Sequence, residues 1–238
     1  MKFWRHDITN YLGRHVLPFN NARVVCPPGW PETRGRLNIV VATPKRCGTH
    51  VLIDIILNNI SAYRNKPLYI DLDKVWQRSR HNPALLDRID LKAGYVIKTH
   101  LPILEPGMSD QKHILELLDS AMVLTVHRDV DAMVRSTLRW AKGNEQDVPN
   151  RVRAEYETFW SFWENRPRIA LEFEDLFNAE RMQSVLADLC VKTSSRPTPH
   201  YRAPTSADRS KTIQLNKAMT RLTGRHALRI DTTIHTLK

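Results

Sequence analysis

The chain has 238 residues, of which 42% are hydrophobic and 26% are charged, and its formal net charge at pH 7 is +11. This length can bury a large core, and the composition is that of a soluble globular protein rather than a disordered or fibrous one. The excess of Lys and Arg favours an anionic partner such as a nucleotide, a nucleic acid or a membrane surface. We expect a single α/β domain over residues 1–238.

The cysteines and the N-terminal residues both bear on the cellular compartment. Cys26, Cys47 and Cys190 are far apart in the chain, which fits neither a disulfide framework nor a zinc site and is typical of a reducing compartment. Arg5 and Asp7 lie where a secretory signal needs an apolar run, and no later stretch reaches about 18 apolar residues. The sequence therefore predicts a cytoplasmic protein without a transmembrane segment.

A strand, a polar loop and a helix are predicted over residues 37–60, because an apolar, β-branched run precedes the loop and apolar residues at helical spacing follow it. The unpaired N–H groups and the dipole at a helix start can hold a phosphate or a sulfate. In the loop, Lys45 and Arg46 supply charge, Gly48 lets the backbone approach closely, and Thr49 can cap the helix or bond an anion oxygen.

The same pattern is also that of an ordinary turn between a strand and a helix, with its cations facing solvent. A nucleotide triphosphatase loop fits badly. The pattern G-x-x-x-x-G-K-[ST] needs a glycine at position 43 and a lysine after Gly48, whereas Thr43 and Thr49 occupy these places.

The rest of the chain alternates strands with helices. Strands are predicted over residues 68–72, 94–102, 121–127 and 168–173, and helices over residues 73–80, 110–119, 130–142, 151–163 and 179–189. Residues 1–36 form an irregular lead-in, and residues 193–238 form a basic segment with a helical signal at 212–222. The alternation predicts a mainly parallel sheet flanked by helices, which binds ligands at the carboxyl ends of its strands.

Cations and a histidine stand at further strand ends. Lys98 and His100 lie near the end of the strand at 94–102, and Arg128 follows the strand at 121–127. Ser136 is two turns into the next helix, so Arg128 and Ser136 can approach one phosphate together.

These residues fall in segments that resemble the sulfotransferases that use 3′-phosphoadenosine 5′-phosphosulfate. Residues 98–102 read Lys-Thr-His-Leu-Pro, which matches the family's K-T-H-L-P segment. Arg128 and Ser136 match the segment that holds the donor's 3′-phosphate. Residues 44–50 look like P-K-S-G-T-T, the family's 5′-phosphosulfate loop, and residues 173–176 look like Y-E-D-L. The four segments occur in the family's order.

The resemblance implies a P-loop-NTPase-like sulfotransferase fold and transfer of a sulfuryl group to a hydroxyl, or less favourably an amine, of a small molecule or a sugar. It makes His100 the general base, with an ordinary pKa near 6.5. Lys98 would face the sulfuryl oxygens. The implied donor-binding residues are Lys45, Arg46, Cys47, Gly48, Thr49, His50, Arg128, Ser136 and Phe173. The resemblance implies neither a metal nor a nucleic-acid partner.

Several positions depart from the family pattern. Alignment on Gly48 puts Arg46 at the family's catalytic lysine, whereas alignment on Pro44 gives that place to Lys45 and demands a one-residue insertion. His50 replaces a threonine and Phe173 replaces a tyrosine. The C-terminal R-K-G-x-x-G segment is absent, and the sequence offers three basic side chains in its place: Arg202, Arg209 and Lys211.

Two other functions compete with this one. A kinase-like phosphoryl transferase would use the same loop, although no lysine follows Gly48 and no acidic strand end for Mg²⁺ is obvious in the sequence. A non-catalytic basic module for nucleic acid is suggested by the net charge alone.

Overall fold

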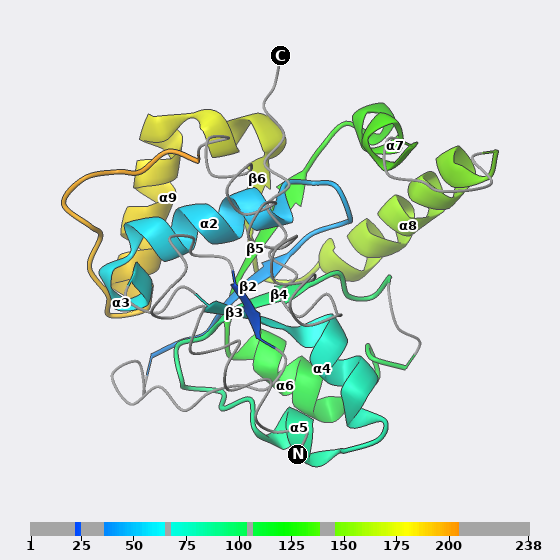
Figure 1. The fold of residues 1–238 in the computed structure, drawn as a ribbon, viewed down its shortest axis with the longest axis horizontal. Coiled ribbons are helices and arrows are strands. Elements are labelled where there is room, and N and C mark those ends of the chain that lie inside the picture. The colour runs from blue at the N-terminus through cyan, green and yellow to red at the C-terminus, as the bar shows by residue number, and fades with distance from the viewer. Residues whose placement is uncertain (1–21, 25–35, 65–67, 104–106, 139–145, 205–238) are drawn as a thin grey trace, which may run out of the picture.

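The computed structural model describes residues 22–24, 36–64, 68–103, 107–138 and 146–204, and these form an α/β fold (Figure 1). The strands are β1 (Ala22–Val24), β2 (Ile39–Ala42), β3 (Leu68–Asp71), β4 (Val96–Thr99), β5 (Met122–His127) and β6 (Ile169–Glu172). The helices are α2 (Thr49–Asn59), α3 (Ser61–Arg64), α4 (Leu72–Ser79), α5 (Ala84–Asp87), α6 (Lys112–Asp119), α7 (Val130–Leu138), α8 (Val148–Trp163), the 3₁₀ helix η2 (Phe173–Phe177) and α9 (Ala179–Lys192).

Five strands form a parallel sheet in the order β3-β4-β2-β5-β6, and the short β1 adds to the outer edge of β3. The first long strand of the chain, β2, is central. Its residue Ile39 pairs with Val96 of β4 on one side and with Met122 of β5 on the other. The chain therefore leaves β2 toward β3 and β4, and then crosses to β5 and β6. The expected parallel sheet with flanking helices is confirmed.

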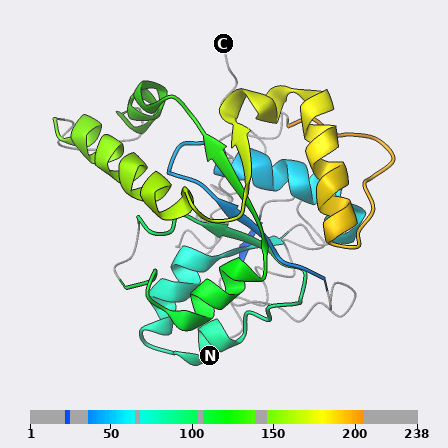
Figure 2. The ribbon, with the colours of Figure 1, turned by 180° about the vertical axis from the view of Figure 1, so that it is seen from behind.

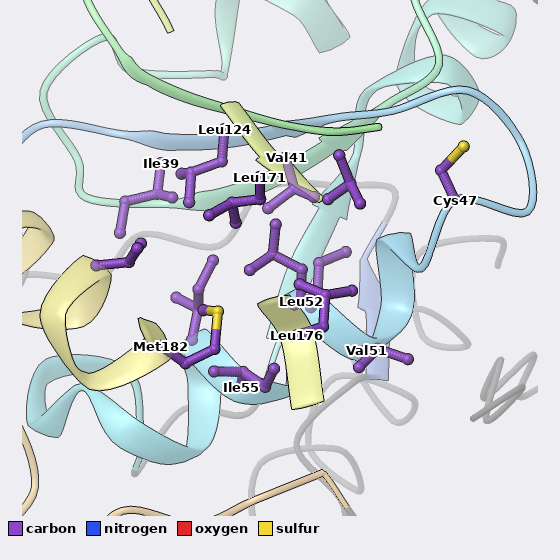
Figure 3. Close-up of a cluster of buried hydrophobic side chains, with 14 of the residues drawn as sticks. Ile39, Val41, Cys47, Val51, Leu52, Ile55, Leu124, Leu171, Leu176 and Met182 are labelled. Atoms are coloured by element: carbon purple, nitrogen blue, oxygen red, sulfur yellow. The ribbon is translucent and has the colours of Figure 1, made fainter. Parts of the chain in front are cut away.

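Alternate residues of β2 serve two different cores. Ile39 and Val41 pack with α2 and α9 on one face of the sheet, whereas Val40 and Ala42 pack with α4 and α6 on the other. The two helical layers are visible in Figures 1 and 2, and Figure 3 shows the first core. Because both faces are covered, a continuous apolar run suits this strand better than an alternating one. The sheet edge at the carboxyl ends of the strands is left for chemistry.

The predicted elements recur with shifted ends. Helix α8 begins at Val148 rather than at residue 151, because Pro149 fits the first turn of a helix. Helix α7 begins at Val130 as predicted, and residues 139–142 of its predicted span lie outside the described residues. Strand β1 lies inside the segment 1–36 that we expected to be irregular. A strand of three residues is too short to give a readable pattern in the sequence.

The described part of the C-terminal segment packs against the end of α2. The side chain of Asn59 binds both backbone groups of Arg202, at 2.6 and 2.9 Å, and Thr198 donates its N–H to the Asn59 carbonyl. The helical signal at 212–222 lies outside the described residues. Among the helices that the structure describes, none has both the length and the apolar composition needed to cross a membrane.

Candidate functional site

The loop between β2 and α2 has the backbone of an anion cradle. Arg46 and Gly48 both adopt positive φ, at 71° and 85°, and Gly48 is the N-cap residue of α2. No side chain caps this helix. The hydroxyls of Thr43 and Thr49 lie 2.5 Å apart and tie the two ends of the loop together. The start of α2 therefore presents its backbone dipoles without a side-chain cap, and the loop before it is held at its two ends.

Gly48 is required at its position for two reasons. Its φ lies in the region that L side chains avoid. In addition, a Cβ there would lie 2.6 Å from a methyl carbon of Leu176 and 3.1 Å from the ring of Phe173. Both neighbours belong to η2, which contains the whole Phe-Glu-Asp-Leu segment noted in the sequence. This segment therefore packs directly against the glycine of the loop.

The loop side chains are fastened to α7 and α8. The Lys45 ammonium lies 3.3 Å from a carboxylate oxygen of Glu155 on α8, and both side chains are part-exposed. The thiol of Cys47 donates to the sulfur of Met133 on α7, at 3.3 Å. Burial raises the pKa of the Cys47 thiol, and the nearby charge of Arg128 opposes this shift. Cys47 is therefore a neutral packing group rather than a nucleophile.

Arg128 reaches the same loop from the end of β5. Its guanidinium donates to the Arg46 carbonyl at 2.5 Å and lies over the Phe173 ring, 3.8 Å from the centroid. Desolvation by burial lowers its pKa, but an arginine stays charged at any physiological pH. Phe173 itself is 3% exposed. Arg128 therefore supports the loop backbone, and Phe173 supports Arg128 and Gly48.

Ser136 lies on α7, which begins two residues after Arg128. It is buried, and its hydroxyl has no hydrogen-bond partner among the described residues. Asp129 caps this helix through the N–H of Ala132, at 2.7 Å, as its place in the sequence suggests. A buried hydroxyl without a partner is costly, so Ser136 is a candidate ligand-binding group.

His100 follows β4 and is joined to the loop by its ring. Its Nδ1 lies 2.7 Å from the Thr43 carbonyl. A carbonyl oxygen only accepts, so Nδ1 carries the proton and Nε2 is the basic nitrogen of the neutral ring. The register of the sheet explains this contact. Ala42 of β2 pairs with Thr99 of β4, so the segments that follow these two strands leave the sheet side by side.

The surroundings of His100 keep its ring neutral. Burial lowers the pKa of His100 well below 6.5, and the charge of Lys98 lowers it further. The Thr43 hydrogen bond and the charge of Asp71 act in the opposite direction but do not outweigh burial. The ring is therefore a neutral proton acceptor at neutral pH.

Lys98 lies in a buried ion-pair cluster. Its ammonium is 2.7 Å from Asp73 and 3.5 Å from Asp71, and all three side chains are nearly inaccessible to solvent. Asp71 ends β3 and caps α4 by accepting the Lys74 N–H at 3.2 Å. The sheet therefore does have an acidic strand end, contrary to our expectation from the sequence. Lys98 pairs with that acidic end.

Most of the expected site residues come together at the carboxyl edge of the sheet. The residues that meet there are loop residues 45–49, Lys98, His100, Arg128 and Phe173. Some of them contact one another directly, and the others are joined through Thr43 or Asp73. His50 lies in the first turn of α2, with its ring 5.8 Å from that of Tyr69. Arg202 is instead anchored at the opposite end of α2, which does not favour it as a phosphate ligand. Arg209 and Lys211 lie outside the described residues.

Sequence reasoning missed three supporting residues. Asp73 holds Lys98, Thr43 holds His100, and Glu155 holds Lys45. Asp73 comes directly after a predicted strand end, which is a usable signal because parallel strand ends share one edge. Thr43 acts through its carbonyl, which any residue has. Glu155 is one of many charged residues on a helix, and its sequence position gives no signal.

No family model matches the chain, and no curated protein matches it. In the part of the chain that the structure describes, no group of three His, Cys, Asp or Glu side chains is arranged to hold a metal ion.

Replacement of Gly48 tests the packing of the loop. We expect Gly48→Ala to lower the free energy of unfolding by about 2–5 kcal/mol, the sum of about 1–2 for the left-handed backbone and about 1–3 for overpacking. Gly107→Ala is the control, because Gly107 has φ 77° and no atom within 4 Å of an added Cβ. Urea denaturation of both variants isolates the contribution of η2. Equal losses would contradict the packing that we describe.

The charge state of His100 can be measured without any substrate. In a ¹⁵N-labelled chain, the ring should stay neutral, with its proton on Nδ1, as the pH falls through 6.5, because burial disfavours the charged form. Lys98→Met should raise the titration midpoint of the ring, since the Lys98 charge lowers that pKa. A His100 ring that titrates at or above pH 6.5 in the unmodified protein would refute this account.

Proposed function

We propose that this protein is a sulfotransferase. It transfers a sulfuryl group from 3′-phosphoadenosine 5′-phosphosulfate to a hydroxyl, or less favourably an amine, of a small molecule or a carbohydrate. The observation that carries this proposal is the bond between His100 and Thr43. It joins a neutral base to the first residue of an anion-binding loop, and this puts proton acceptance next to anion binding.

Two features support the fit of the donor. The 5′-phosphosulfate is matched by the loop at 43–49, where a helix start without a side-chain cap lies beside Lys45 and Arg46. The 3′-phosphate is matched by Arg128 together with Ser136, whose buried hydroxyl has no partner among the described residues. A phosphate oxygen would accept a hydrogen bond from that hydroxyl. The phosphosulfate and the 3′-phosphate then have separate binding groups.

The reaction would need only these residues and the two substrates. When bound, the donor supplies the sulfuryl group, and adenosine 3′,5′-bisphosphate leaves. His100 Nε2 accepts the proton of the acceptor hydroxyl. At the same time, the hydroxyl oxygen bonds to sulfur, and the bond between sulfur and the phosphate oxygen breaks. The positive end of α2, with Lys45 or Arg46, stabilises the charge on the leaving phosphate. For Lys45 to stabilise that charge, its ammonium must leave Glu155. Arg46 is the alternative cation in the loop.

The acidic end of β3 is the one observation that favours a kinase-like phosphoryl transferase, because such enzymes bind Mg²⁺ through carboxylates. Here, however, Asp73 accepts from Lys98, Thr99 and the His100 N–H. The Lys98 ammonium already pairs with Asp73 and lies 3.5 Å from Asp71, so a metal cation would have to displace it. We therefore place this function second, and a basic nucleic-acid module third.

Ligand-induced thermal stabilisation tests the donor. Adenosine 3′,5′-bisphosphate should raise the melting temperature, whereas ATP with Mg²⁺ should not. Ser136→Ala should weaken binding by roughly tenfold, the equivalent of one hydrogen bond of about 1.4 kcal/mol. Without ligand, Ser136→Ala should have a melting temperature no lower than that of the parent protein, since the Ser136 hydroxyl has no hydrogen-bond partner to lose among the described residues.

Thr137→Ala is the matched control for Ser136→Ala. It removes a neighbouring hydroxyl that bonds the Met133 carbonyl at 2.9 Å, so donor affinity should be preserved. Stabilisation by ATP with Mg²⁺ alone would instead support the phosphoryl transferase, and salt-sensitive RNA or DNA binding without either nucleotide would support the basic module.

Replacement of His100 tests the reaction itself. His100→Ala should lower the transfer rate by about 10²–10⁴, the usual contribution of a general base, while the protein still binds adenosine 3′,5′-bisphosphate. His81→Ala, at an exposed turn after α4, is the control and should retain the full rate. Undiminished transfer by His100→Ala would disprove the assignment of the base.

A further inference from the structure

Asp73 makes three buried hydrogen bonds, although it lies outside the four segments that resemble the sulfotransferases. Its Oδ1 accepts from the Thr99 hydroxyl at 2.8 Å and from the His100 backbone N–H at 3.0 Å. Its Oδ2 accepts from the Lys98 ammonium at 2.7 Å. The residue is 4% exposed. One carboxylate on α4 therefore holds three consecutive residues of β4 and its end.

We propose that Asp73 is the positioning residue of the site, which fixes His100 and Lys98 together for transfer. This inference rests on the proposed function. His100 is held at two points: Asp73 binds its backbone and the Thr43 carbonyl binds its ring. With both points fixed, Nε2 has one orientation. General-base catalysis depends on that orientation, because a displacement of about 1 Å can cost about 100-fold in rate.

The same carboxylate determines where the Lys98 charge lies. Asp73 is closer to the ammonium than Asp71 is, at 2.7 Å against 3.5 Å. An ammonium buried this deeply needs a close carboxylate partner. Asp71 also caps α4 by accepting the Lys74 N–H. Asp73 therefore carries the positioning role, and Asp71 is the natural comparator.

Two substitutions separate the Lys98 contact of Asp73 from its contacts with Thr99 and the His100 N–H. Asp73→Ala removes all three hydrogen bonds. Asp73→Asn keeps an oxygen for Thr99 and the His100 N–H, but its amide cannot accept from Lys98. We expect Asp73→Ala to lower kcat by about 100-fold and Asp73→Asn to lower it at least about tenfold, while both bind adenosine 3′,5′-bisphosphate within about threefold of the parent protein. The reason is that the three bonds of Asp73 reach residues 98–100 and not the loop.

Asp71→Asn is the matched control. It removes a buried negative charge beside the same ammonium but leaves the bonds of Asp73 in place. Its kcat should therefore be at least about tenfold higher than that of Asp73→Ala. Equal kcat in Asp73→Ala and Asp71→Asn would show that the general loss of buried charge, rather than positioning, explains the effect.

Nitrogen NMR of the His100 ring provides a readout that does not depend on transfer. The parent chain and Asp73→Asn should carry the proton on Nδ1, whereas Asp73→Ala should show exchange between the two tautomers. A fixed Nδ1 proton together with parental kcat in Asp73→Ala would overturn the proposal. If Asp73→Ala does not fold, parental kcat in Asp73→Asn overturns it.

The two proposals fail in different ways. If the parent chain neither binds adenosine 3′,5′-bisphosphate nor transfers sulfuryl groups, the proposed function is wrong. In that case the NMR comparison still decides the role of Asp73: exchange in Asp73→Ala supports its hold on His100, and a fixed Nδ1 proton refutes it.

Discussion

The parallel pairing of β2 with both β4 and β5 is the constraint on which the site depends. Because Ile39 is in register with Val96 on one side and Met122 on the other, β2 and β4 end at the same level and β5 runs two residues further. Each strand end contributes one part: the loop after β2, His100 after β4, and Arg128 after β5. A slip of one residue in either pairing would turn the side chains of that strand to the opposite face, and this would separate the parts.

The site is also held together by backbone groups of the loop. The carbonyl of Thr43 accepts from His100, and the carbonyl of Arg46 accepts from Arg128. The same loop contains two residues with positive φ, Arg46 and Gly48, and this conformation costs about 1–2 kcal/mol for a residue with a side chain. Gly48 avoids the cost and Arg46 bears it. Strain of this kind persists only where the surroundings fix it, and Arg128 and the buried Cys47 do so here.

Most elements of this fold could be read from the sequence, but the contacts between them could not. Strand β2 is a continuous apolar run, and the strand-end rule correctly grouped the loop with His100 and Arg128. The strand order cannot be read in this way, because the pattern of a buried strand does not say which strands are its neighbours. The Lys98–Asp73 pair was missed for the same reason: it depends on β3 lying beside β4. Strand β1 and the helices of four residues are too short to give a periodic signal.

In the proposed function, one side chain, Arg128, serves both the structure and the ligand. A guanidinium has five N–H donors in a planar fork, and the described contact with the Arg46 carbonyl uses one of its nitrogens. The Phe173 ring covers one of its faces and so orients the edge of the fork. A residue that had to leave the loop in order to bind a phosphate would lose the loop geometry at the moment of binding. Arg128 can keep the carbonyl and still offer donors from its other nitrogens, so the loop conformation and a phosphate clamp are compatible in one structure.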